Sequence, residues 1–143
     1  PGRKVEKLFR LYRKQRRAAA VVEFAIVAPL FFLLVFGMIE YGRMVMVQQI
    51  LTNASREGAR SAVLDGATAT EVQNEVDEFL EQSSIAGADV TVTPSDPSTV
   101  AFGDPITVTV AIDCVDVSWL PSPMYLGGQE LTASTSMQRE TSQ

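Results

Sequence analysis

The side chains able to do chemistry in this sequence are carboxylates, hydroxyls and a few arginines, because it contains no His and a single Cys, Cys114. Without His the chain lacks the commonest general base and the commonest catalytic metal ligand. One Cys forms neither an intrachain disulfide nor a Cys-rich zinc site, and we expect Cys114 to be a small buried residue at a strand end. The sequence therefore argues against triad hydrolases, zinc enzymes and disulfide scaffolds, and we expect no catalysis, metal or cofactor.

Glu23 is the acid with the most unusual surroundings, because it is the one charged residue in the apolar run Ala18–Ile39. A carboxylate in hydrocarbon is costly unless it is protonated or finds a partner. At the helical rise, Glu23 lies only about 9 Å from Arg17, so it can reach the headgroups or an arginine of its own chain. That structural interpretation gives Glu23 no role beyond being satisfied near the membrane surface.

The run Ala18–Ile39 is predicted to cross a membrane. Its 22 residues form a helix of roughly 33 Å, enough for a hydrocarbon core of about 30 Å. Residues 1–17 contain eight basic residues and one acid, a net charge of +7 that leaves −12 for the rest of the chain. Because basic flanks stay in the cytoplasm, we expect a cytoplasmic leader (1–17), a transmembrane helix (18–40) and an extracytoplasmic domain (41–143). The acidic domain makes nucleic-acid binding unexpected.

A cleaved secretory signal peptide is the alternative for the first 40 residues. The apolar run is longer than a signal core of about 7–15 residues, and no A-x-A-like site followed by a polar start comes after it. We therefore expect the segment to be retained. Position 1 is Pro rather than an initiator Met, so we expect the natural start to be missing or trimmed.

The rest of the chain predicts an α+β fold. Helical periodicity continues through 41–64, and Asp65-Gly66 is a stop signal. Thr70 is predicted to head a second helix through a capping box with Gln73, and the carboxylates of that helix fit a solvated face better than a calcium site. Alternation of period two predicts three antiparallel strands, with long loops between them. The strands are expected at 88–93, 106–112 and 130–139, and the loops at 94–105 and 118–128.

Two groups of charged residues and one aromatic group are candidates for partner docking. Glu40 and Arg43, three apart at the outer membrane edge, are expected to form an exposed pair worth a few tenths of a kcal/mol. Arg56 and Arg60 share a helix face beside Glu57, and either acids of the second helix satisfy them or they dock an acidic partner. Trp119 and Tyr125 lie in an apolar loop that either closes the core over the sheet or contacts a partner.

Sequence patterns at the membrane boundary resemble a known family. Arg16–Phe24, RRAAAVVEF, places a lone Glu soon after a basic leader, as in prepilins of the type IV class. Val22–Arg43 combines Glu-Phe, a Pro within the apolar run and Glu-Tyr-Gly-Arg, and it is followed by LTNA at 51–54 and REGAR at 56–60. Over about residues 16–64 this combination resembles the TadE family, pseudopilins or minor pilins of the tight-adherence (Flp) pilus machinery. The later strands carry no comparable motif.

The resemblance implies a pilin-like α+β fold and roles for particular residues. A prepilin peptidase would cut between Ala18 and Ala19, making Glu23 the fifth residue of the mature protein, although the family usually has Gly where Ala18 stands. Glu23, beside Phe24, would then pair with the free amine of Ala19 on a neighbouring subunit and set the register of packed helices. Pro29 would mark a local unwinding or kink that helps the helices pack.

The sequence thus predicts a single-pass protein of the bacterial inner membrane that primes, caps or regulates a tight-adherence pilus. Its expected partners are the lipid bilayer, other pilins, the assembly platform and the prepilin peptidase, in a homo- or hetero-oligomer and then in the pilus after extraction. The alternative is an unprocessed membrane-anchored scaffold of a secretion or pilus machine, which would keep its leader.

Overall fold

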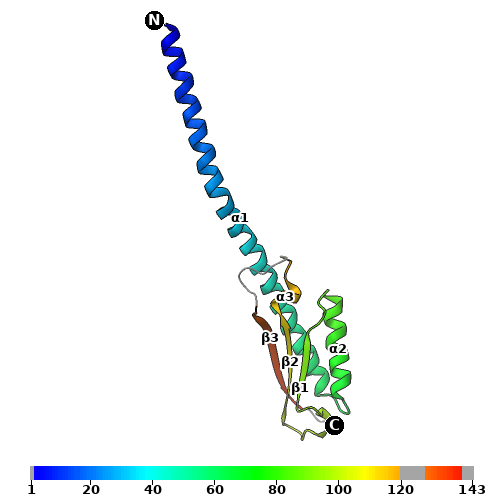
Figure 1. Cartoon of the computed structure of the whole chain (residues 1–143). Helices are drawn as coiled ribbons and strands as arrows, with labels where there is room; N and C mark the ends of the chain where they lie inside the picture. Colours follow the sequence, from blue (N-terminus) through cyan, green and yellow to red (C-terminus); the bar gives the residue numbers. More distant parts are fainter. Residues whose placement is uncertain (1, 120–127, 140–143) are drawn as a thin grey trace. The chain divides into compact units, whose positions relative to one another are not determined.

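The computed structural model describes residues 2–119 and 128–139, with side chains from residue 19 onward. The chain divides into two compact units, Pro1–Ile39 and Glu40–Gln143. The predicted α+β class, with a long N-terminal helix, a second helix and a three-stranded antiparallel sheet, is confirmed (Figure 1). The elements in chain order are α1 (Gly2–Ala62), α2 (Ala69–Gln82), β1 (Asp89–Thr93), η1 (Pro97–Thr99), β2 (Pro105–Asp113), α3 (Cys114–Val117) and β3 (Glu130–Gln138).

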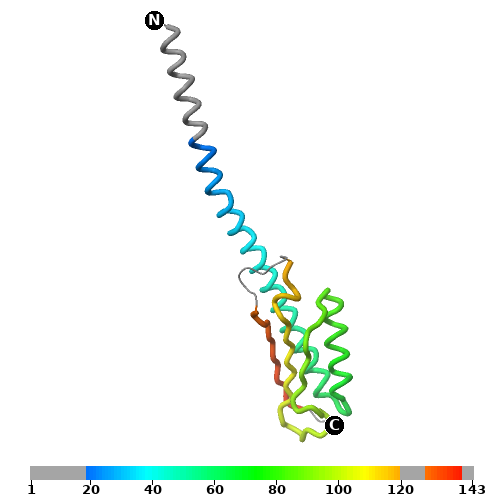
Figure 2. Tube along the Cα trace, in the orientation of Figure 1, coloured from blue at the N-terminus to red at the C-terminus, as the bar shows by residue number. Residues whose placement is uncertain are grey.

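The sheet of the second unit has the order β1-β2-β3, with both neighbouring pairs antiparallel (Figure 2). Val108 in the central strand pairs with Val92 on one side and with Thr135 on the other. The alternating apolar residues of β2 are buried, as their period of two predicts. This alternation gives the sheet one apolar face and one polar face.

The part of α1 that lies in the second unit and helix α2 pack against the apolar face. Their buried residues recur at helical spacing, which is why these segments fold as amphipathic helices. Gly58 marks the closest approach, since a Cβ built there would lie 2.5 Å from a methyl of Val76 on α2 and 3.1 Å from one of Val108 on β2. The core contributed by the helices consists of Met44, Val47, Leu51, Ala54, Ala59, Ala62, Val72, Val76 and Leu80.

The start of α2 differs from the sequence prediction. Thr68, not Thr70, is the N-cap, and it forms the capping box with Glu71. The Glu71 amide donates to the Thr68 hydroxyl at 3.3 Å, and the Thr68 amide donates to the Glu71 carboxylate at 3.0 Å. Gln73, the predicted partner, instead donates to the Val90 carbonyl on β1 at 3.1 Å. Two overlapping patterns fit the box, and the one with Glu at the third helical position forms.

A glutamine from a helix binds each outer strand of the sheet. Gln73 of α2 bonds to Val90 of β1, and Gln48 of α1 donates to the Thr132 carbonyl of β3 at 2.9 Å. Each bond joins a helix to an edge strand of the sheet. The helices are therefore held to the sheet by polar contacts at both edges as well as by the core between them.

The polar face of the sheet carries aligned hydroxyl groups. Thr91, Thr109 and Ser134 lie in one cross-strand row, and the Thr109 and Ser134 hydroxyls are 3.1 Å apart. The row formed by Thr93, Thr107 and Ser136 lies beside it. This face is exposed or half-buried, in keeping with its composition.

The connections contain two short elements that periodicity did not reveal. The predicted 94–105 loop includes the η1 turn, and Pro105 already belongs to β2. The four-residue helix α3 follows β2 directly, and Ser118 and Trp119 come after it. Such short helices carry too few residues for a helical pattern to be read from the sequence.

Candidate functional site

The apolar part of α1 is exposed along its length. Glu23, Phe24 and Pro29 all have exposed side chains, as does Ala19, and Ala18 lies in α1 with its side chain outside the described residues. Pro29 has no amide hydrogen, so the Ala25 carbonyl lacks its usual helical donor. Within the described part of the chain, this is the one helix long and apolar enough to cross a membrane, in the range Ala19–Ala62. The exposed surface requires lipid or other helices to cover it.

Glu40, the first residue of the second unit, is buried rather than exposed. Its side chain is 2% exposed, and Oε1 accepts a 2.5 Å hydrogen bond from the Ser118 hydroxyl. Oε2 is also buried and has no hydrogen-bond partner among the described residues. The prediction of an exposed Glu40–Arg43 pair is wrong, because the chain after α3 folds back onto this part of α1 and supplies the partner.

Arg43 instead holds the segment that follows α3. Its Nε donates to the Val117 carbonyl at 3.3 Å, and its guanidinium carbon lies 5.1 Å from the centroid of the Trp119 ring. Nη1 also lies 3.9 Å from the Met46 sulfur. Arg43 forms no ion pair with a described carboxylate, so its charge faces an aromatic ring and a carbonyl dipole.

Trp119 does not close the core. It is 70% exposed, so the expectation that this residue closes the core over the sheet is wrong for Trp119, and contact with a partner stays a prediction. Tyr125, the other aromatic candidate of this loop, lies outside the described residues. Ser118 was not a candidate in the sequence, because nothing local distinguishes it from the other serines.

Cys114 is buried at the end of β2, as predicted, and is 1% exposed. Burial raises the pKa of its thiol, and the carboxylates of Asp113 and then Glu40 raise that pKa further. The thiol is therefore held in its protonated, unreactive form. Its environment is that of a small core residue, not that of a nucleophile.

The arginines of the REGAR motif are satisfied within their own helix or face solvent. Arg60 pairs with Glu57 at 3.5 Å, both on α1, and the Arg60 side chain is mostly exposed. Arg56 is exposed as well. Neither arginine forms an ion pair with a described carboxylate of α2, so the predicted pairing with the second helix is wrong. Docking of an acidic partner remains a prediction for this face.

Part of α1 matches a known family. Residues 18–60 match the family model of TadE-like protein. This match confirms the resemblance found in the sequence and covers the stretch from Ala18 to the REGAR motif, hereafter the TadE-like segment. Comparison with curated proteins and comparison with solved structures gave no match. The sheet, α2 and α3 lie outside the TadE-like segment.

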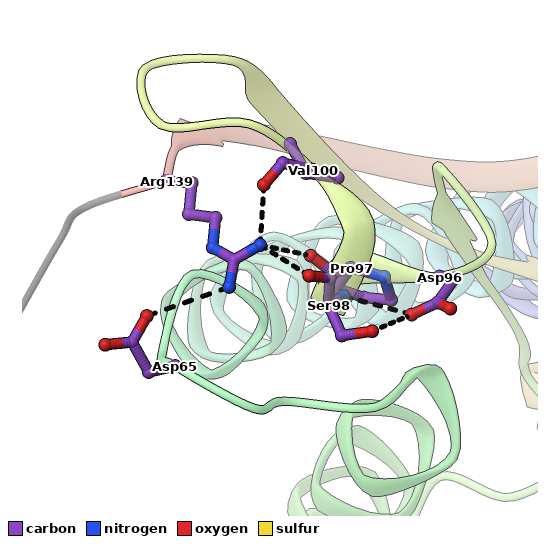
Figure 3. A network of polar contacts seen from close by, with 6 residues as sticks. All are labelled: Asp65, Asp96, Pro97, Ser98, Val100 and Arg139. Carbon is purple, nitrogen blue, oxygen red and sulfur yellow. Dashed lines mark hydrogen bonds and ion pairs between the residues drawn. The ribbon is translucent and has the colours of Figure 1, made fainter.

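Arg139, which sequence analysis did not single out, joins three segments of the second unit. Its Nη1 donates to the carbonyls of Pro97, Ser98 and Val100, at 3.2, 2.8 and 2.6 Å, as Figure 3 shows. Its Nη2 lies 3.7 Å from the Asp65 carboxylate. This one guanidinium joins the η1 loop, the end of β3 and the α1–α2 turn, which is a structural role.

A shallow pocket lies beside Arg139. It is lined by Val63, Phe102, Gly103, Met137, Gln138 and Arg139. The Arg139 guanidinium is already used by carbonyls and Asp65, and the described residues contain no cluster of His, Cys, Asp and Glu able to hold a metal ion. The pocket therefore has mixed polar and apolar walls, and its one charged side chain is already engaged.

Proposed function

We propose that this chain is a TadE-like minor pilin or pseudopilin of the tight-adherence (Flp) pilus system. The observation that carries the proposal is Glu23, a lone carboxylate on the exposed apolar stretch of the TadE-like segment. A stretch of this kind anchors the protein in a bilayer before assembly and packs against other apolar helices after extraction. The acidic head, residues 41–143, supplies subunit contacts, so the role is structural and not catalytic.

Glu23 gives the helix packing its register. A carboxylate among apolar helices needs a cationic or donor partner. In the mature protein, the free amine of Ala19 on a neighbouring subunit is that partner, four residues before Glu23 in its own chain. Cleavage between Ala18 and Ala19 creates this amine, so processing by the prepilin peptidase precedes assembly. Pro29, which removes the usual helical donor to the Ala25 carbonyl, lets the helix bend where copies pack.

Orientation and partners follow from charge. The +7 leader faces the cytoplasm and the acidic head lies outside the inner membrane. The other pilins and the assembly platform are the protein partners in this proposal, with Arg56, Glu57 and Arg60 on an exposed face of α1 for docking. The unprocessed membrane-anchored scaffold is the competing function, and it differs in keeping residues 1–18.

The first test measures processing. The full-length chain is expressed with the peptidase and pilus proteins of a tight-adherence system, extracted from membranes and weighed by intact mass spectrometry. A mature start at Ala19 supports the pilin function. A mass that retains the leader favours the scaffold and removes the amine on which the Glu23 pairing depends.

The second test measures partner recovery. Glu23→Gln keeps the shape of the side chain and removes its charge, so we expect at least about a 10-fold loss of co-purified pilin subunits if a buried ion pair is broken. Glu78→Gln is the control, because it removes one charge from the exposed face of α2, outside both the apolar stretch and the proposed docking face. Equal recovery for Glu23→Gln and the unaltered protein would refute the register role.

A further inference from the structure

Trp119 is the only Trp in the chain, and its exposure is not explained by pilin packing through α1. The ring is 70% exposed, with the Arg43 guanidinium over it and Met46, also exposed, beside that guanidinium. Arg43, Met46 and Trp119 are called the Trp119 patch below. Large aromatic side chains left in water at a defined place on a protein mark a contact surface.

The position of Arg43 in the chain indicates what covers this patch. Arg43 follows Ile39, the end of the apolar run, by four residues of α1. At the helical rise this is about 6 Å, and the headgroup layer outside the hydrocarbon core is about 5–8 Å thick on each side. The hydrogen bond from Arg43 to Val117 and the stacking of Arg43 on Trp119 hold Trp119 beside the same turn of helix. Trp and Tyr favour this layer in membrane proteins, and Tyr41 is exposed there too.

The charge of Arg43 fits the same partner. Residues 40–143 contain four basic residues, all Arg, against 15 acids. Arg139 is engaged by carbonyls and Asp65, and Arg60 is paired with Glu57. Arg43 has no described carboxylate partner, and a guanidinium binds a phosphate through paired hydrogen bonds.

We propose that the Trp119 patch seats the head on phospholipid headgroups, with Trp119 and Met46 at the edge of the hydrocarbon and Arg43 on a lipid phosphate. The contact rests on the membrane anchoring in the proposed function and adds a second attachment between the head and the bilayer. It holds the head against the membrane before assembly and is lost when the subunit leaves the bilayer.

The experiment uses the single Trp as its own probe. The full-length protein is reconstituted into phosphatidylcholine vesicles whose acyl chains carry bromine near the headgroup end, near the methyl end, or not at all. Because an interfacial ring lies at headgroup depth, we expect about a two-fold loss of Trp emission with shallow bromine and a smaller loss with deep bromine. Both leaflets carry the quencher, so the orientation of the inserted protein does not matter.

Substitutions test whether the quenching depends on the residues of the Trp119 patch. Arg43→Gln is expected to reduce quenching by shallow bromine, whereas Glu78→Gln, which changes the charge by one unit on the exposed face of α2, is expected to leave it unchanged. Circular dichroism melting in detergent checks that both variants fold. If Arg43→Gln unfolds the head, Met46→Gln, which removes apolar surface from the patch without touching the Val117 bond, is expected to reduce the quenching in its place.

Two measurements distinguish failure of the headgroup contact from failure of the membrane anchor. Vesicle flotation reports anchoring independently of Trp119. Protein that floats but shows no shallow quenching overturns the headgroup contact and leaves the proposed pilin intact, whereas protein that does not float overturns the membrane anchor and the contact together. Trp emission that shifts with protein density at constant lipid, without bromine quenching, identifies a protein partner and also overturns the proposal.

Discussion

The Ser118 hydroxyl donates a 2.5 Å hydrogen bond to the Glu40 carboxylate, which stands 78 positions earlier in the chain and is 2% exposed. The bond ties the residues after α3 to the first residue of the second unit. Because Glu40 Oε2 has no partner among the described residues, Ser118 is the described donor that offsets the burial of this acid. Together with the Arg43–Val117 bond, it fixes the segment that presents Trp119.

Ser118→Ala is therefore predicted to destabilise the head. The substitution leaves a buried carboxylate without this donor, so the free energy of unfolding should fall by about 1–3 kcal/mol. Urea unfolding of the full-length protein in detergent, followed by circular dichroism, measures the change. Ser134→Ala is the control, because its hydroxyl bonds to Thr109 on the exposed face of the sheet, and a change within about 0.5 kcal/mol is expected there. Equal effects of the two substitutions would contradict the role given to Ser118.

Gly58→Ala is predicted to destabilise the packing of α1 against α2. The added methyl would lie 2.5 Å from Val76, and overpacking of this kind typically costs about 1–3 kcal/mol, more than the gain of about 1 kcal/mol in helix propensity. Thermal unfolding in detergent measures the net effect.

Gly42→Ala, also on α1, provides the matched control for Gly58→Ala. A Cβ at Gly42 would meet nothing within 4 Å, so the same substitution should raise stability by up to about 1 kcal/mol. The double variant Gly58→Ala with Val76→Ala should recover part of the loss, because Val76 supplies the nearest atom. Stabilisation by Gly58→Ala alone would show that the helices separate easily at this point.

The secondary structure was predictable wherever burial imposes a period. The alternation of Ile106, Val108, Val110 and Ile112 indicated the central strand. The spacing of Val47, Leu51 and Ala54 indicated the buried face of α1. In both elements the apolar residues mark the side that faces the core. The TadE-like segment was recognised for a similar reason, since its motif lies in one continuous stretch of 43 residues.

The candidate site was less predictable because its contacts join distant parts of the chain. Local spacing suggested an exposed Glu40–Arg43 pair. Instead, Glu40 bonds to Ser118, and Arg43 contacts Val117 and Trp119. Periodicity gives no information about a contact between residues 78 positions apart. The α2 cap was misplaced by two residues because Thr68 and Thr70 both begin a matching pattern. Arg139 was missed because carbonyl groups, which the sequence does not distinguish, are its main partners.

The capping box predicts a specific dependence of stability on pH. Hydrogen bonds from the Thr68 amide and hydroxyl lower the pKa of Glu71 below its ordinary value of 4.5. A lowered folded-state pKa stabilises the fold above pH 4.5, and this contribution is lost as the pH falls through the lowered value. Glu71→Gln should therefore reduce the melting temperature at pH 7, and its difference from the unaltered protein should shrink on acidification.

Glu78→Gln tests whether that effect belongs to the cap. It removes one charge from the exposed face of the same helix and takes no part in the capping box. Melting curves of both variants between pH 3 and pH 7, taken by circular dichroism in detergent, make the comparison. A loss of melting temperature as large for Glu78→Gln as for Glu71→Gln would assign the effect to the overall charge of α2 and not to Thr68.

Cys114 is predicted to resist alkylation in the folded protein. Its thiol is 1% exposed, and burial, Asp113 and Glu40 together raise its pKa above the ordinary 9.0, so little thiolate forms near neutral pH. Iodoacetamide at pH 8 should react at least about 10-fold more slowly than with the urea-unfolded chain, because reaction requires local opening.

Asp113→Asn should move the midpoint of the rate–pH profile of Cys114 downward, since it removes a carboxylate that opposes ionisation of the thiol. Asp113 makes no side-chain hydrogen bond to cap α3, so this substitution leaves the start of that helix intact. Asp116→Asn, on α3 but not among the groups that raise this pKa, should leave the midpoint in place. Fast labelling of the folded chain, or equal profiles for Asp113→Asn and the unaltered protein, would contradict the buried and acid-flanked position given to the thiol.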